Sequence, residues 1–250
     1  MSAPKLASFK IVYLVWAPPS QTPGETRRQL LEDCAPRLLA LGALRLQMNI
    51  VDPFADVRSP APGVPFERPI NAQVNVWVAA LDDRIALEDA LRRAGFELAG
   101  YLVDEQIYTD YGGNRHAGPR DWPDGERSPG VLLVTLMERP KRLAREEWIR
   151  RWHGVQSPMS EAMQPRTRYV RNVVLQSLTA GSIPFEGIVE EAFPSFRHVT
   201  NPFLFYGASN PFALVRNMAI MLRSVTSFLT LWKIRTRPTS EYFVRSDFPS

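Results

Sequence analysis

The chain is poor in the residues that build disulfides and metal clusters. Its 250 residues include one cysteine and three histidines. The lone Cys34 excludes an intrachain disulfide and a cysteine-based zinc cluster. The histidines stand at positions 116, 153 and 198 without metal-ligand spacing, so neither a metal nor another cofactor is expected. This cysteine usage is typical of a cytoplasmic protein.

The chain also lacks a basic tract and an uninterrupted apolar span. Lys and Arg total 30 against 26 acidic residues, a formal charge of +4, with no run of five basic residues, so a nucleic-acid partner is not expected. The apolar run 11–16 is too short for a signal peptide and is interpreted as a buried strand. Residues 211–232 contain Arg216 and Arg223, which would be costly inside a bilayer. We expect an amphipathic core helix followed by a strand there, and no membrane partner.

One short pattern occurs twice, about half a chain apart. The two copies are related by an offset of 122 residues that becomes 123 after a single-residue gap. The matched pairs are Val12/Val134, Leu14/Leu136, Pro18/Pro140, Glu25/Glu147, Cys34/Gln156, Pro36/Pro158, Arg45/Arg168 and Asn49/Asn172. A match that runs through a strand, a helix and a second strand predicts a repeated structural unit.

Hydrophobic periodicity and breakers predict the order β-α-β-β-α-β in the first copy. The expected elements are a strand at 9–16, a helix at 24–42, a strand at 44–52, a proline-rich loop at 53–69, a strand at 72–81, a helix at 83–95 and a strand at 97–111. Pro36 lies inside the first helical pattern, which we expect to end or kink near Ala35. Gln73 and Asn75 give the third strand one polar face.

The second copy repeats this order after a polar connector. Its expected elements are a strand at 130–138, a helix at 143–156, strands at 167–176 and 185–193, a helix at 211–225 and a strand at 227–244. The sequence therefore predicts an α+β chain of two ferredoxin-like units, at 1–111 and 130–250, joined by a linker at 112–129. Two such sheets bury their uncovered faces by packing into one barrel, so we expect a pseudo-dimeric monomer or a further homo-oligomer.

The second copy resembles the EthD family of the dimeric α/β-barrel superfamily over about 45 residues. The matching residues are Glu147, Trp148, Trp152, Pro158, Arg168, Tyr169 and Asn172. The family histidine aligns with Gln156 here and with Cys34 in the first copy, while His153 stands three residues before Gln156. The resemblance implies a cofactor-independent enzyme acting on a small hydrophobic or aromatic molecule, and this chain departs from the family pattern in having no histidine at either aligned position.

The candidate site residues each have a functional and a structural interpretation. His153 is the candidate general acid or base, or else a cation near a helix C-terminus. Arg168, Tyr169 and Asn172 are candidates to orient a substrate oxygen. Because Arg45 and Asn49 recur in the first copy, an architectural role is favoured for Arg168 and Asn172. Cys34 is expected to be a buried small hydrophobe and not a nucleophile.

Aromatic residues provide the remaining candidates for ligand contact. Trp148, Trp152 and Gln156 belong to the EthD-like segment. Phe203, Phe205 and Tyr206 belong to an insertion at 194–211, for which we expect a loop lid. The alternative to an enzyme is a non-catalytic barrel that binds or carries a small molecule, and a purely oligomeric scaffold is a third hypothesis.

Overall fold

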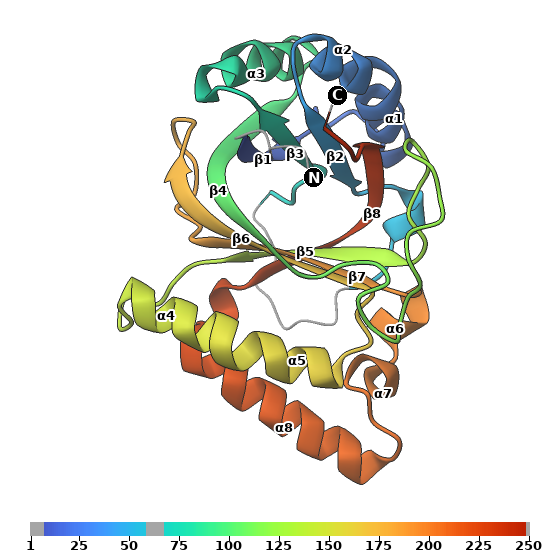
Figure 1. Cartoon of the computed structure of the whole chain (residues 1–250), viewed down its shortest axis with the longest axis vertical. Coiled ribbons are helices and arrows are strands. Elements are labelled where there is room, and N and C mark those ends of the chain that lie inside the picture. The colour runs from blue at the N-terminus through green and yellow to red at the C-terminus, as the bar shows by residue number, and fades with distance from the viewer. Residues whose placement is uncertain (1–7, 59–67, 249–250) are drawn as a thin grey trace, which may run out of the picture.

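Eight antiparallel strands form one closed barrel with helices on its outside (Figure 1). The computed structural model describes residues 8–58 and 68–248. The strands are β1 (Phe9–Trp16), β2 (Arg45–Ile50), β3 (Ala72–Val78), β4 (Glu97–Thr109), β5 (Val131–Met137), β6 (Arg168–Ser177), β7 (Gly187–Phe193) and β8 (Arg235–Arg245).

The strand order around the barrel is β1-β3-β2-β8-β5-β7-β6-β4. Each copy contributes four neighbouring strands, which confirms the predicted pair of ferredoxin-like units and the α+β class. Hydrogen bonds between β2 and β8 and between β4 and β6 join the two sheets edge to edge. The N-terminal parts of the long strands β4 and β8 pair with β1 and β5 of their own units. Their C-terminal parts pair with β6 and β2 of the other unit. Neither sheet therefore keeps a free edge within this barrel.

Helices cover the outer faces of both sheets. They are α1 (Pro23–Arg28), α2 (Ala35–Ala40), α3 (Arg84–Arg93), α4 (Arg145–Arg151), α5 (Ser157–Met163), α6 (Phe196–Thr200), α7 (Pro202–Phe205) and α8 (Pro211–Phe228). Short 3-10 turns lie at Pro53–Ala55, Leu81–Asp83 and Leu231–Lys233. The sequence places the fourth strand of the second unit at 227–244, but α8 continues to Phe228 and β8 begins at Arg235.

Of the two outcomes expected at Pro36, an end or a kink near Ala35, the helix does not end there. A π-helical turn at Gln29–Cys34 joins α1 directly to α2, and a second one at Trp152–Gln156 joins α4 to α5 ahead of Pro158. Proline removes one backbone donor and its ring crowds the preceding turn of an α-helix. The wider π turn relieves that crowding, so the helix continues past the proline in both copies.

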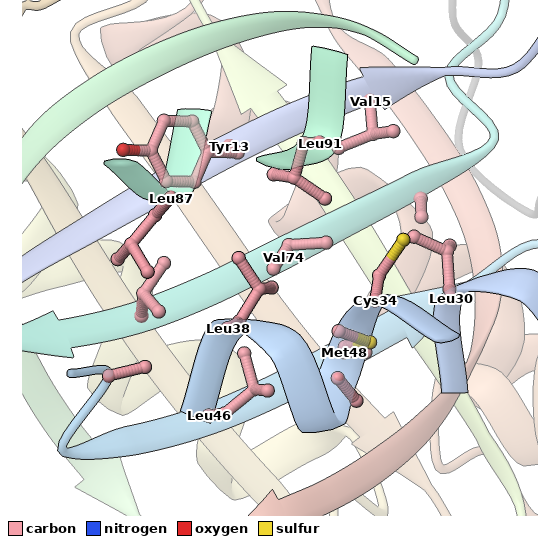
Figure 2. Close-up of a cluster of buried hydrophobic side chains, with 14 of the residues drawn as sticks. Tyr13, Val15, Leu30, Cys34, Leu38, Leu46, Met48, Val74, Leu87 and Leu91 are labelled. Carbon is pink, nitrogen blue, oxygen red and sulfur yellow. The ribbon is translucent and has the colours of Figure 1, made fainter. Parts of the chain in front are cut away.

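The first unit packs its helices onto the outer face of its sheet. Figure 2 shows Leu30, Cys34 and Leu38 from the first helical segment in one buried cluster with Val74 and Met48 of the sheet. A capping box between Thr22 and Glu25 starts that segment. Gly42 and Gly95 end the two helical segments with φ of 103° and 90°, a region that favours glycine, as the sequence predicts.

The second unit covers its sheet differently. The insertion expected as a loop lid forms α6 and α7, and Phe205 stacks on Phe193 of β7 with ring centroids 5.5 Å apart. The long helix α8 contacts α4, α7 and the π turn between α4 and α5, and it forms the outermost layer at one end of the molecule (Figure 1). The insertion thus covers part of the sheet while α8 lies outside the first helical layer.

The two proline-rich connections lie in different places. The connector 112–129 runs beside β8, where the Gly125 and Ser128 amides donate to the carbonyls of Phe243 and Glu241 at 2.6 and 2.8 Å. Of the predicted loop 53–69, residues 59–67 lie outside the described residues.

In the part of the chain that the structure describes, no helix is long and apolar enough to cross a membrane.

Candidate functional site

The centre of the barrel holds a buried carboxylate. The Glu190 side chain on β7 is fully buried and points inward. Its oxygens accept hydrogen bonds from Lys10 Nζ (3.5 Å), Gln47 Nε2 (3.0 Å), Asn49 Nδ2 (3.4 Å), Gln73 Nε2 (2.9 Å), Asn75 Nδ2 (2.9 Å) and Asn172 Nδ2 (2.9 Å). Donors from both units thus converge on one side chain.

The surrounding donors keep Glu190 ionised. Burial alone would raise the pKa of this carboxyl group, but Lys10, Arg168 and the amide donors lower it to about 2. Arg168 Nη1 lies 3.7 Å from Glu190 and 3.0 Å from Glu241. For Glu241 the direction is opposite, because burial raises the pKa more than Arg168 and Tyr111 lower it. The interior therefore contains a charged and largely hydrogen-bonded network.

Glu190 also marks a break in the internal repeat. Val12 pairs with Asn75 in the first unit, and the equivalent Val134 pairs with Glu190 in the second. Asn75 and Glu190 therefore occupy equivalent positions, and they contact each other across the pseudo-twofold centre. Sequence reasoning found the polar face of β3 but missed Glu190, since it adjoins a second glutamate in an otherwise apolar strand.

Arg168 and Asn172 lie inside the barrel. They share a face of β6, as predicted, and Asn49 makes the same contact with Glu190 as its equivalent Asn172. Protein groups already occupy most of their hydrogen-bonding capacity. Among the described side chains of the interior, Gln47 Oε1 and Asn172 Oδ1 have no hydrogen-bond partner.

A second cluster lies on the opposite, outer face of β6. The buried rings of Trp148 and Trp152 are 5.0 Å apart, and Trp152 Nε1 donates to the Tyr169 hydroxyl at 3.1 Å. A Cβ at Gly187 would come within 3.0 Å of both indole rings, so glycine permits their close approach to β7. The structure brings these three predicted residues together but separates them from Arg168 and Asn172 by the sheet.

His153 stands at the edge of this outer cluster in the π turn. Its half-buried ring packs against Trp152 at 4.5 Å, and its Nε2 is buried without a hydrogen-bond partner. Burial lowers the pKa of His153, and the positive charge of Arg171 adds to that effect, giving about 4 despite the opposing Asp104. The imidazole is therefore neutral at neutral pH, with a nitrogen free to accept a proton.

Arg171 is the member of this cluster that sequence reasoning missed. Its Nη1 donates to Ser157 Oγ at 3.2 Å and its Nη2 to Gln106 Oε1 at 3.1 Å, while Ser157 Oγ lies 3.3 Å from the Tyr169 hydroxyl. The alternation of Tyr169 and Arg171 along β6 is the signal that could have placed both on the helix side. A neutral imidazole beside a fixed guanidinium can bind an oxyanion and accept the proton released in forming it.

The other predicted ligand contacts lie elsewhere. Gln156 Nε2 donates to Met221 Sδ of α8 at 3.2 Å, and its Oε1 has no partner. Tyr206 packs edge-on against Phe205, and its carbonyl accepts from Asn217 Nδ2 at 2.9 Å. Phe203 is the second residue of the short helix α7 (Pro202–Phe205). The insertion residues thus contribute to the packing between β7 and α8, and their role in ligand binding stays a prediction.

Cys34 should be chemically inert in the folded protein. It is buried in the first-unit core, and burial together with Asp33 raises the pKa of its thiol to about 11. Since the thiolate is the reactive form, we expect no labelling by iodoacetamide at pH 8 within the time that fully labels the urea-unfolded chain. Mass spectrometry of the two samples measures this, and rapid labelling of native protein would contradict the assignment.

Comparison with known proteins yields matches of structure only. No protein-family model and no curated sequence matches the chain. An anthrone oxidase-like protein aligns over 97% of this chain and 96% of its own, with 10% identity and a TM-score of 0.59. The chain with the printed sequence therefore has the dimeric α/β-barrel fold. A mutant chlorite dismutase from Candidatus Nitrospira defluvii aligns over 95% of this chain and 92% of its own, at 8% identity and a TM-score of 0.46.

The dimeric α/β barrel is here completed within one polypeptide. The match to the anthrone oxidase-like protein spans nearly the whole chain, including both repeats. Within such a barrel, the inner network around Glu190 and the outer cluster around His153 are distinct sites on the two faces of the second sheet. The inner one consists of side chains hydrogen-bonded to Glu190, whereas the outer one has a half-buried imidazole at its edge.

Proposed function

We propose that the protein is an EthD-like, cofactor-independent enzyme that removes a proton from a small aromatic carbonyl compound. The observation that carries this proposal is His153, a neutral imidazole whose Nε2 has no partner and which lies close to the Arg171 guanidinium. The EthD-like segment around Trp148 and Trp152 supports it, because this segment forms the same outer cluster.

The proposed chemistry begins with proton transfer to His153 Nε2. This atom is buried in the structure, so the half-buried ring must turn outward before a substrate can reach it. A C–H group conjugated with a carbonyl, directly or through an aromatic ring, gives up its proton, and the electron pair delocalises onto the carbonyl oxygen as an enolate or phenolate. Arg171 stabilises that oxyanion. Molecular oxygen then acts as the oxidant. For anthrone, one O₂ converts the CH₂ group to a carbonyl, giving anthraquinone and one water.

Anthrone is a suitable probe because a structural neighbour is described as anthrone oxidase-like. The experiment measures oxygen uptake and anthraquinone formation with purified protein, after subtraction of the spontaneous oxidation in buffer. The matched control substrate is 10,10-dimethylanthrone, which has the same ring system and no acidic C–H. The proposal requires that anthrone be oxidised and the dimethyl compound be unchanged.

The pH dependence of kcat/KM gives an independent test. His153 must be neutral to accept a proton, and burial beside Arg171 lowers its pKa to about 4. We therefore expect the rate to be lost as the pH falls through about 4 and to show no titration of His153 between pH 5 and 7. A limiting pKa at or above the ordinary histidine value would contradict the assignment of His153 as this base.

The second candidate function is a non-catalytic carrier of the same class of molecule. It is favoured by one observation, the presence of Gln156 where the EthD-like pattern has histidine, with its Oε1 unpartnered. Native mass spectrometry distinguishes the two functions. A carrier retains anthrone or a copurified ligand unchanged in aerated buffer, whereas the enzyme converts the probe and releases the product.

A further inference from the structure

The helix α8 exposes an apolar surface at one end of the molecule. The sequence predicts a core helix, but only Asn217, Met221 and Phe228 of its 18 residues are buried. Its exposed large apolar side chains are Phe212 (85%), Val215 (68%), Leu222 (51%), Met218 (44%) and Ile220 (42%). A soluble helix normally directs such residues to the core, so a contiguous exposed set indicates a binding surface.

The charged residues on and beside α8 indicate which kind of partner this surface binds. The helix contains Arg216 and Arg223 and no acidic residue. At seven residues apart, the two arginines lie on one stripe beside Phe212. At the C-terminal end, Arg142 Nη2 donates to the Thr226 carbonyl and Arg151 Nη1 to the Ser227 carbonyl, both at 2.8 Å. Basic groups therefore border the apolar residues along the helix.

We propose that α8 docks onto the surface of an anionic lipid bilayer. The apolar side chains would enter the boundary between headgroups and acyl chains, and Arg216 and Arg223 would lie at the level of the phosphates. The helix forms the outermost layer of the molecule (Figure 1), so it can reach a flat surface. Trp232, which is 71% exposed just after α8, adds a side chain suited to the membrane interface.

A second copy of the chain fits this surface less well. A twofold contact between two α8 helices would bring four arginines together, with no carboxylate on either helix to compensate them. An anionic bilayer supplies that compensation. Peripheral docking differs from spanning, so it is compatible with the absence of a spanning helix in the described residues, but it departs from the expectation of no membrane partner.

Flotation of the full-length protein with lipid vesicles tests the proposal. We expect binding to vesicles of phosphatidylcholine with 30 mol% phosphatidylserine, weak binding to phosphatidylcholine alone, and loss of binding at high salt. Replacing Phe212 and Leu222 by serine should lower the partition coefficient by more than about tenfold. Each of Arg216→Gln and Arg223→Gln should lower it by about fivefold on the anionic vesicles only.

The matched control is Ile85→Ser, which removes an equally exposed apolar side chain from α3 and should leave partitioning unchanged. Circular dichroism and the melting temperature verify that each variant is folded. Equal binding by wild type and the serine variant, or no binding to anionic vesicles, overturns the proposal. A wild-type oligomer that the Phe212 and Leu222 changes dissociate, without vesicle binding, would assign the surface to a second copy.

Discussion

Replacing Glu190 by glutamine is expected to lower the free energy of unfolding by about 3–5 kcal/mol, because it removes the buried carboxylate on which two buried cations and the interior amide donors converge. Lys10 and Arg168 are both nearly fully buried, and each lies within 4 Å of this carboxylate. Glutamine keeps the size of the side chain but removes the negative charge, and its amide places two donors among groups that already donate. Urea unfolding followed by circular dichroism measures the change.

Glu147→Gln is the matched control for this variant. The pKa of Glu147 is also lowered to about 2, through hydrogen bonds from Arg150 and Arg151, but these ion pairs lie at the protein surface. Solvent screens such pairs, so we expect little change in stability. Equal effects at Glu147 and Glu190 would show that burial of the Glu190 network contributes nothing beyond a surface ion pair.

The same network predicts how stability depends on pH. The pKa of Glu190 falls from 4.5 to about 2 on folding, so its ionised form stabilises the native state above pH 4.5. That contribution is lost progressively as the pH falls from 4.5 towards 2. The difference in unfolding free energy between wild type and Glu190→Gln should therefore be largest near neutral pH and shrink in acid. A difference that grows in acid would contradict the assigned direction.

Replacing His153 by glutamine is expected to lower kcat/KM for anthrone oxidation by about 10²–10⁴-fold, the contribution of a general base. Glutamine has polar atoms of similar reach, but it cannot accept the proton at neutral pH. The change should act on the rate and leave binding of the probe largely intact, because Arg171, which holds the substrate oxygen, is unaltered. Steady-state kinetics and fluorescence titration separate the two effects.

His198→Gln provides the control for His153→Gln. His198 Nδ1 lies 2.9 Å from Ser195 Oγ at α6, away from the outer cluster of β6. Its removal should leave turnover unchanged. A second variant, His153→Ala, leaves a space in which added imidazole should restore part of the activity. Full turnover by His153→Gln would contradict the role of His153 as the general base. Binding of anthrone without turnover by the wild type would favour the carrier function.

The sequence predicted the fold more fully than the candidate site. Strand alternation was enough to predict two ferredoxin-like units, together with the constant offset that relates Arg45 and Asn49 to Arg168 and Asn172. A repeated pattern requires a repeated structure. Local rules also located the glycines that end the helices and the buried Cys34. The same rules did not predict that the helix continues past Pro36, since helix propensity does not contain the π turn that precedes the proline.

The site could not be predicted because its residues share strands with residues of the other face. Arg168, Tyr169, Arg171 and Asn172 are near neighbours in sequence, yet alternation places two inside the barrel and two beneath the helices. Whether each face is filled or open depends on distant elements. Glu190 meets Gln47 and Asn75 of the first unit, whereas Arg171 meets Ser157 and Gln106.

The sequence by itself determined the strand order, the duplication and the absence of a second cysteine, because each depends on local pattern or on counting. Only the tertiary structure decided that equivalent positions Asn75 and Glu190 meet at the barrel centre, and that the apolar residues of α8 face outward. Closing the barrel brings residues more than a hundred positions apart into contact. The insertion at α6 and α7 covers part of the sheet, so α8 packs on other helices and leaves Phe212 exposed.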